Sequence, residues 1–159
     1  KHTGAELDQD GTHALSGTVD TAALSRLAQN PFFSVRPPKS LDRDAWNTAF
    51  LKDLSLADGA ATLSAFTVRA VALALEHLPK RPRAWYVTGG GRLNPALMQG
   101  LQKVLGVPVA PVEALGWDGD ALEAQGFAYL AVRSLKGLPL SLPGTTGVPA
   151  PLSGGTLHH

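Results

Sequence analysis

The feature that most constrains the fold of this sequence is a run of three glycines between an apolar segment and a helix start. Residues 84–88, Ala-Trp-Tyr-Val-Thr, are short, apolar and rich in β-forming side chains, which favours a buried strand. The triglycine at 89–91 predicts a sharp turn, and Asn94-Pro95 pairs an asparagine cap with a proline at the first helical position. Strand, turn and helix together predict an α/β fold in which a ligand can meet the carboxyl end of the strand.

The segments around this unit extend the α/β pattern. Apolar residues recur every three or four positions from Leu63 to His77, which predicts a long helix capped by Asp58 and closed by Pro79. The helix that opens at Asn94 should end at Gly106, and residues 107–112 should form a second strand near a sheet edge.

Four further segments are predicted with less regular patterns. Residues 5–17 are expected to be a loop or short edge element, and Asp20 to begin a short helix. Asp42 is expected to cap a helix that carries Trp46 and Phe50. Asp118 or Asp120 should start a last long helix with a face formed by Ala124, Phe127, Ala128 and Ala131, and the tail from Gly137 should wrap the surface as irregular chain.

Composition bounds the class of protein. The 159 residues suffice for a single domain over 1–159, and 44% apolar with 17% charged residues fits a soluble globular chain. The net charge of +1, without a basic run between aromatics, gives no case for nucleic-acid binding. No segment approaches the ~18 consecutive apolar residues of a membrane span. The absence of cysteine is compatible with a reducing cytoplasm, and a start without Met is expected of a piece of a longer chain.

The glycine turn is the first candidate for chemistry. Gly89, Gly90 and Gly91 would let the chain approach a ligand without side-chain collision, and the helix at Asn94 would present free N–H groups to a phosphate or a ribose oxygen. The alternative is a tight strand-to-helix connection without a ligand. Neither a Walker loop nor a complete dinucleotide fingerprint is present.

Glu123, early in the last predicted helix, is the second candidate. Its carboxylate could accept a hydroxyl hydrogen bond or orient a water, and Asp120 one turn away could couple to it so that one pKa rises for acid–base work. The alternative is that both acids only complement the helix dipole. Lys39 is a third candidate, because its ammonium group could bind a phosphate or another anion. The alternative is that Lys39 belongs to a solvated turn without a ligand. The histidines are scattered and form no metal site.

Several motifs together resemble one known family. They are Asn30-Pro31-Phe32-Phe33 with Pro37-Pro38-Lys39-Ser40, Asp58-Gly59-Ala60-Ala61-Thr62-Leu63, Gly89-Gly90-Gly91-Arg92-Leu93-Asn94-Pro95, Gly119-Asp120-Ala121-Leu122-Glu123-Ala124 and Leu142-Pro143-Gly144. In this order they are similar to the carboxy-terminal part of the bacterial anhydro-N-acetylmuramic acid kinases. Residues 39–44 depart from that pattern, reading Lys-Ser-Leu-Asp-Arg-Asp where the family usually has Lys-Ser-Thr-Gly-Arg-Glu.

The resemblance implies a fold and a reaction. It implies the carboxy-terminal lobe of an actin-like, ribonuclease-H-like ATPase fold, with a short sheet flanked by helices. It also implies a cytoplasmic, homodimeric carbohydrate kinase that uses ATP and Mg²⁺ carried by the nucleotide. That enzyme opens the 1,6-anhydro ring of its amino sugar and phosphorylates position 6 in peptidoglycan recycling.

The resemblance also implies roles for single residues. Glu123 matches a family glutamate at the sugar that helps position the attacking water, while Gly89, Gly90, Gly91 and Asn94 match the nucleotide side. The family's amino-terminal phosphate loop, Gly-Thr-Ser-x-Asp-Gly, and its Asp-Thr-Gly-Pro-Gly-Asn segment with the catalytic aspartate do not occur here. The chain alone is therefore expected to be inactive. The alternatives are a non-catalytic nucleotide-binding or interaction module, and a related sugar kinase with another acceptor.

Overall fold

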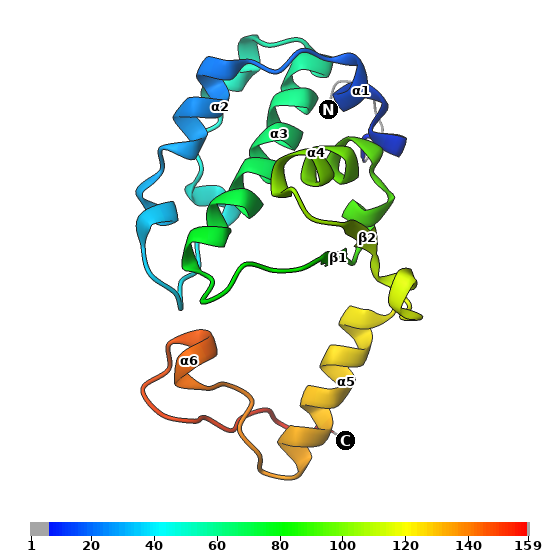
Figure 1. Cartoon of the computed structure of the whole chain (residues 1–159). Coiled ribbons are helices and arrows are strands. Elements are labelled where there is room, and N and C mark those ends of the chain that lie inside the picture. The colour runs from blue at the N-terminus through cyan, green and yellow to red at the C-terminus, as the bar shows by residue number, and fades with distance from the viewer. Residues whose placement is uncertain (1–6, 159) are drawn as a thin grey trace.

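The computed structural model describes residues 7–158, and a β-α-β unit lies at one edge of a body of helices (Figure 1). Strand β1 (Trp85–Val87) pairs in parallel with β2 (Val109–Pro111), and the connection runs through a 3-10 helix (Gly90–Leu93) and α4 (Pro95–Leu105). The α/β class and the predicted order of strand, glycine turn, helix and strand are confirmed. Each strand is shorter than its predicted run, since ladder pairing covers only Trp85–Val87 and Val109–Pro111.

Helix α4 has the ends that the sequence predicts. The Asn94 side chain accepts hydrogen bonds from the backbone N–H groups of Ala96 at 2.9 Å and Leu97 at 3.3 Å. Pro95 occupies the first turn, and Gly106 ends the helix in the left-handed conformation with φ of 64°.

Helix α3 (Leu56–Ala74) is the central element, and it packs against α1 (Thr12–Ser16), α2 (Thr21–Ala28) and α4. The predicted cap at Asp58 is wrong: Ser55 is the N-cap, and its hydroxyl accepts a hydrogen bond from the Asp58 N–H at 3.1 Å. The Asp58 carboxylate instead accepts a hydrogen bond from the Thr18 N–H at 2.7 Å, which ties the segment before α2 to α3. The predicted cap of α2 at Asp20 is confirmed.

The core lies between α3, α4 and one face of the sheet. Val68, Leu101 and Leu105 are buried together, and Trp85 and Val109 of the two strands pack against them. Helices α3 and α4 approach closely, since a Cβ built on Gly100 would lie 2.7 Å from a methyl carbon of Val68. The glycine turn that follows β1 is therefore adjacent to the buried core formed by α3, α4 and the sheet.

Leu105→Ala is expected to lower the free energy of unfolding by about 2–5 kcal/mol. Leu105 is only 1% exposed, so its truncation leaves a cavity in the core. Urea denaturation followed by circular dichroism measures the change. Val104→Ala is the matched control, since that neighbour is 48% exposed and should shift stability by only about 0.5 kcal/mol. Equal effects of the two substitutions would contradict the assignment of the core.

Two other segments have a different secondary structure from the one that the sequence predicts. The segment predicted as a loop or edge element is helical where it is described, with a 3-10 helix (Gln9–Gly11) followed by α1; residues 5 and 6 lie outside the described part. The helix predicted after Asp42 is replaced by short 3-10 helices (Arg43–Ala45 and Ala49–Asp53). The Trp46 ring packs instead against aromatic rings of two other elements, with its centroid 5.1 Å from that of Phe66. Ring contacts between elements thus decide the path of this segment.

Helix α5 (Leu122–Leu135) stands apart from α1–α4 and continues into an arm that holds α6 (Pro143–Thr146) (Figure 1). Its N-cap is Ala121, so neither Asp118 nor Asp120 caps it. Among the described residues, none of α5 is buried, and Phe127 of its predicted apolar face is 65% exposed. The predicted irregular tail is partly helical, since it contains α6, and it folds back beside α5, where Ser141 and Leu152 form an isolated antiparallel bridge. It reaches the α1–α4 body near Pro38, whose ring lies 3.4 Å from a Cβ built on Gly147.

One described helical stretch, Leu56–His77, is long and apolar enough to cross a membrane by length and composition, with a mean hydropathy of 1.3. It comprises α3 and the 3-10 helix Leu75–His77. Because this stretch carries Val68 of the core and packs against three other helices, its apolar character has an explanation in the fold. The core helix of a soluble protein satisfies the same two criteria.

Candidate functional site

A pocket of about 580 Å³ lies between the end of β1 and the start of α5. Gly89 and Gly90 line one side, and Asp120 and Glu123 line the other, with Thr88, Gly119 and Leu122 completing the wall. Residues that are more than 30 positions apart in the sequence therefore meet in one cavity. The structure brings together the glycine turn and the glutamate that the sequence singled out separately.

The first two glycines open onto free space. A Cβ built on Gly89 or on Gly90 would have no other heavy atom within 4 Å, so a side chain at either position would project outside the packed chain. Gly89 also has a φ of 69°, which disfavours any residue with a Cβ. This part of the turn therefore leaves open space beside its backbone.

Gly91 and Asn94 do not line this pocket. They line a second cavity, of about 440 Å³, together with Gly90, which borders both cavities, and with Asp8 and Asp10 from the segment before α1. The N–H groups of Ala96 and Leu97 are occupied by the Asn94 side chain, so these two are not free for a phosphate as the sequence pattern proposed. Asn94 shapes the turn by capping the helix behind it.

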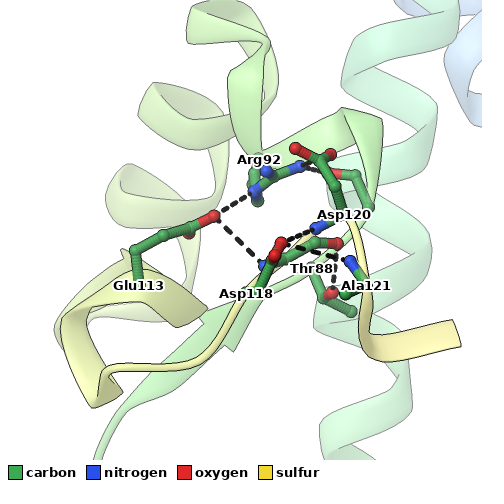
Figure 2. Close-up of polar contacts among 8 residues, drawn as sticks. Thr88, Arg92, Glu113, Asp118, Asp120 and Ala121 are labelled. Carbon is green, nitrogen blue, oxygen red and sulfur yellow. Dashed lines mark hydrogen bonds and ion pairs between the residues drawn. The ribbon is translucent and has the colours of Figure 1, made fainter. Parts of the chain in front are cut away.

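Arg92 joins the glycine turn to the segments that follow β2, through Glu113 and Asp120 (Figure 2). Its Nη1 donates to the carbonyl oxygen of Gly89 at 3.0 Å and to Oδ1 of Asp120 at 2.8 Å, while its Nε donates to Oε1 of Glu113 at 2.7 Å. The Arg92 side chain is only 5% exposed. Sequence reasoning missed Arg92 and Glu113, because nothing in their spacing marks them as partners; a single arginine inside a glycine turn was the one available signal.

The ion pairs of Arg92 with Glu113 and Asp120 determine the protonation of these two carboxylates. Hydrogen bonding to the Arg92 guanidinium lowers the pKa of Asp120, and the same guanidinium lowers the pKa of Glu113. The expectation that Asp120 and Glu123 couple so that one pKa rises is therefore wrong for Asp120, whose carboxylate is held ionised by Arg92. Within residues 7–158, no hydrogen bond or ion pair engages the Glu123 side chain, which lines the pocket as a carboxylate open to a ligand.

Lys39 is not placed to bind an anion. Its Nζ donates to the carbonyl oxygens of Phe32 at 2.8 Å and Phe33 at 3.1 Å, and lies 3.1 Å from Nε2 of His77. It also sits 4.6 Å from the centroid of the Phe32 ring. The ammonium group thus serves the chain's own carbonyls, which corrects the third candidate. Among the described residues, no group of three His, Cys, Asp or Glu side chains could hold a metal ion.

Comparisons with known proteins identify the family of this chain. The family description "Anhydro-N-acetylmuramic acid kinase" matches residues 1–159. Proteins of that name are 57% identical over 98% of this chain in Acidiphilium cryptum (strain JF-5), and 54% identical over 99% of it in Rhizorhabdus wittichii and over 98% in Rhodospirillum rubrum. The aligned part is 44%, 43% and 42% of those relatives, so the chain spans less than half of their length. The chain belongs to the anhydro-N-acetylmuramic acid kinase family.

Proposed function

We propose that this chain is the carboxy-terminal lobe of an ATP-dependent kinase with an actin-like fold that acts on anhydro-N-acetylmuramic acid. The observation that carries the proposal is the shared pocket, which Gly89, Gly90 and Glu123 line together. Family membership supports the choice of substrate, because the matching relatives bear the name of that kinase. The role in peptidoglycan recycling, the cytoplasmic location and the homodimer belong to the same proposal.

The proposed reaction joins hydrolysis to phosphoryl transfer. Water adds to the anomeric carbon of the 1,6-anhydro sugar, and the bond from that carbon to O6 breaks. O6 takes the γ-phosphoryl group that ATP supplies, so the products are the 6-phosphorylated sugar and ADP. The proton that water loses passes to a base outside this chain, the role the resemblance assigns to an aspartate. Glu123 orients that water by accepting a hydrogen bond from it.

The residues of the pocket fit a nucleotide on one side. The open space at Gly89 and Gly90 would let a ribose or a phosphate come close to the backbone of the turn. Gly91 and Asn94 support that turn from behind through the cap of α4. Mg²⁺ carried by the phosphates of ATP would screen their charge, as the family resemblance implies.

Gly90→Val is expected to weaken ATP binding about tenfold or more, since the added side chain would occupy the space left for the ligand. Isothermal titration of the full-length product of the gene that encodes this chain measures the dissociation constant. Gly59→Val is the matched control, because Gly59 also has no heavy atom within 4 Å of a built Cβ but lies outside the pocket. Unchanged ATP affinity in Gly90→Val would contradict the proposal that the nucleotide binds at this turn.

The deciding experiment for the function is a transfer assay with the same gene product, ATP and 1,6-anhydro-N-acetylmuramic acid. Formation of the 6-phosphorylated sugar supports the proposal. ATP binding without transfer to this sugar, but with transfer to another, would point to a related sugar kinase. ATP binding without transfer to any sugar would point to a non-catalytic nucleotide-binding module.

A further inference from the structure

A small polar network joins the start of α5 to the glycine turn, while the arm after α5 approaches the body separately, at Pro38. Among residues 7–158, α5 has no buried residue and no extensive packing against α1–α4. The polar contacts between the glycine turn and the segment before α5 lie around Arg92, Glu113 and Gly119 (Figure 2). The position of Glu123, which belongs to the first turn of α5, therefore follows from that network.

Gly119 is the point where the two walls of the pocket touch. Its carbonyl oxygen accepts hydrogen bonds from the Gly89 N–H at 3.3 Å and from the Thr88 hydroxyl at 3.2 Å. Its own N–H donates to Oε1 of Glu113 at 3.3 Å. Oε1 of Glu113 is also the acceptor for Nε of Arg92, so one oxygen holds both the arginine and the backbone before α5.

The fit of Arg92 under this backbone leaves no room for a side chain. A Cβ built on Gly119 would lie 2.3 Å from Nε and 2.7 Å from Cζ of Arg92. The guanidinium thus packs directly beneath the turn while its Nη1 binds Asp120 beyond it. Arg92 does not line the pocket, so it does not reach a ligand there.

We propose that Arg92 is a positioning residue, which holds Glu123 opposite the glycine turn by binding Gly89, Glu113 and Asp120 at once. This inference rests on the proposed function for the role of Glu123. Loss of the guanidinium leaves the core of Val68, Leu101 and Leu105 intact, because none of the Arg92 contacts involves it. The carboxylates of Glu113 and Asp120 then lose their common partner, and the turn before α5 is released.

The kinetic test is a double-mutant cycle in the full-length gene product. Arg92→Ala should lower kcat for the anhydro sugar about 30- to 100-fold, as expected for a displaced group, while the dissociation constant for ATP changes less than about threefold. In a protein that already carries Glu123→Ala, adding Arg92→Ala should lower kcat by less than about threefold. The same factor in both backgrounds would overturn the proposal, because Arg92 would then act without Glu123. Arg81→Ala, which removes a hydrogen bond to the Leu105 carbonyl oxygen, is the matched control and should leave kcat unchanged.

A second readout is independent of activity. Amide hydrogen exchange in residues 118–125 should rise about tenfold in Arg92→Ala and in Gly119→Ala, with exchange in residues 97–105 of α4 unchanged. Unchanged exchange in residues 118–125 would overturn the positioning role whether or not the wild-type protein phosphorylates the sugar. Failure of the wild-type transfer assay together with the expected exchange would instead refute the proposed function and leave Arg92 as the residue that positions α5.

Discussion

Replacing Glu123 with alanine in the full-length gene product is expected to lower kcat for phosphoryl transfer to anhydro-N-acetylmuramic acid by about 100- to 1,000-fold. The expectation follows from its place in the pocket, where no described group engages its carboxylate and the glycine turn lies opposite. Loss of a positioned group that handles the reacting water typically costs about 10²–10⁴ in rate. Steady-state kinetics with saturating ATP measures the change.

The control for this substitution is Gln125→Ala, a change on an exposed residue of the same helix that does not line the pocket. Its kcat should stay within about twofold of the wild type, since exposed positions outside a site rarely matter. The dissociation constant for ATP should be unchanged in both variants. A Glu123→Ala enzyme with wild-type kcat would remove Glu123 from the reaction and leave the pocket as a nucleotide site alone.

The 159-residue chain by itself is expected to show no turnover. None of the side chains that line the pocket is cationic, so the pocket wall itself offers no lysine or arginine to neutralise a transferring phosphoryl group. Arg92 cannot serve, because it is buried behind the wall and paired with Glu113 and Asp120. An assay of the chain beside the full-length gene product, at matched concentrations, measures the difference.

Two outcomes decide this prediction. Product formed by the full-length protein and not by the chain supports the view that groups outside these residues complete the site. Product formed by the chain alone would contradict it and would require a phosphate-binding group among residues that the pocket does not include. A chain variant with Glu123→Ala then separates true turnover from a contaminating kinase, because only true turnover depends on that residue.

Local signals in the sequence predicted the elements that local chemistry dictates. The helix from Asn94 to Gly106 was predictable because a side-chain cap, a proline and a glycine with positive φ act within a few residues of each end. The paired strands were predictable because short apolar runs on either side of such a helix need to be buried. The same logic placed the glycine turn at the end of β1.

Local signals failed where a distant partner competes for the same group. Asp58 has the chemistry of a cap, yet its carboxylate binds the N–H of Thr18, which lies 40 residues away in the chain, and Ser55 caps the helix instead. Asp120 has the spacing of an acid–base partner for Glu123, yet Arg92 binds it at 2.8 Å and lowers its pKa. Spacing along one helix does not reveal such partners.

The candidate site divides in the same way. The residue types that a ligand-binding turn and a water-orienting acid require were readable in the sequence as Gly89, Gly90 and Glu123, and the motif order indicated the family. Their meeting in one pocket depends on the packing of β1 and α4 and on the contacts of Arg92 with two segments that follow β2. A buried guanidinium selects its carboxylates by position in space, and that position exists only after the β-α-β unit has formed.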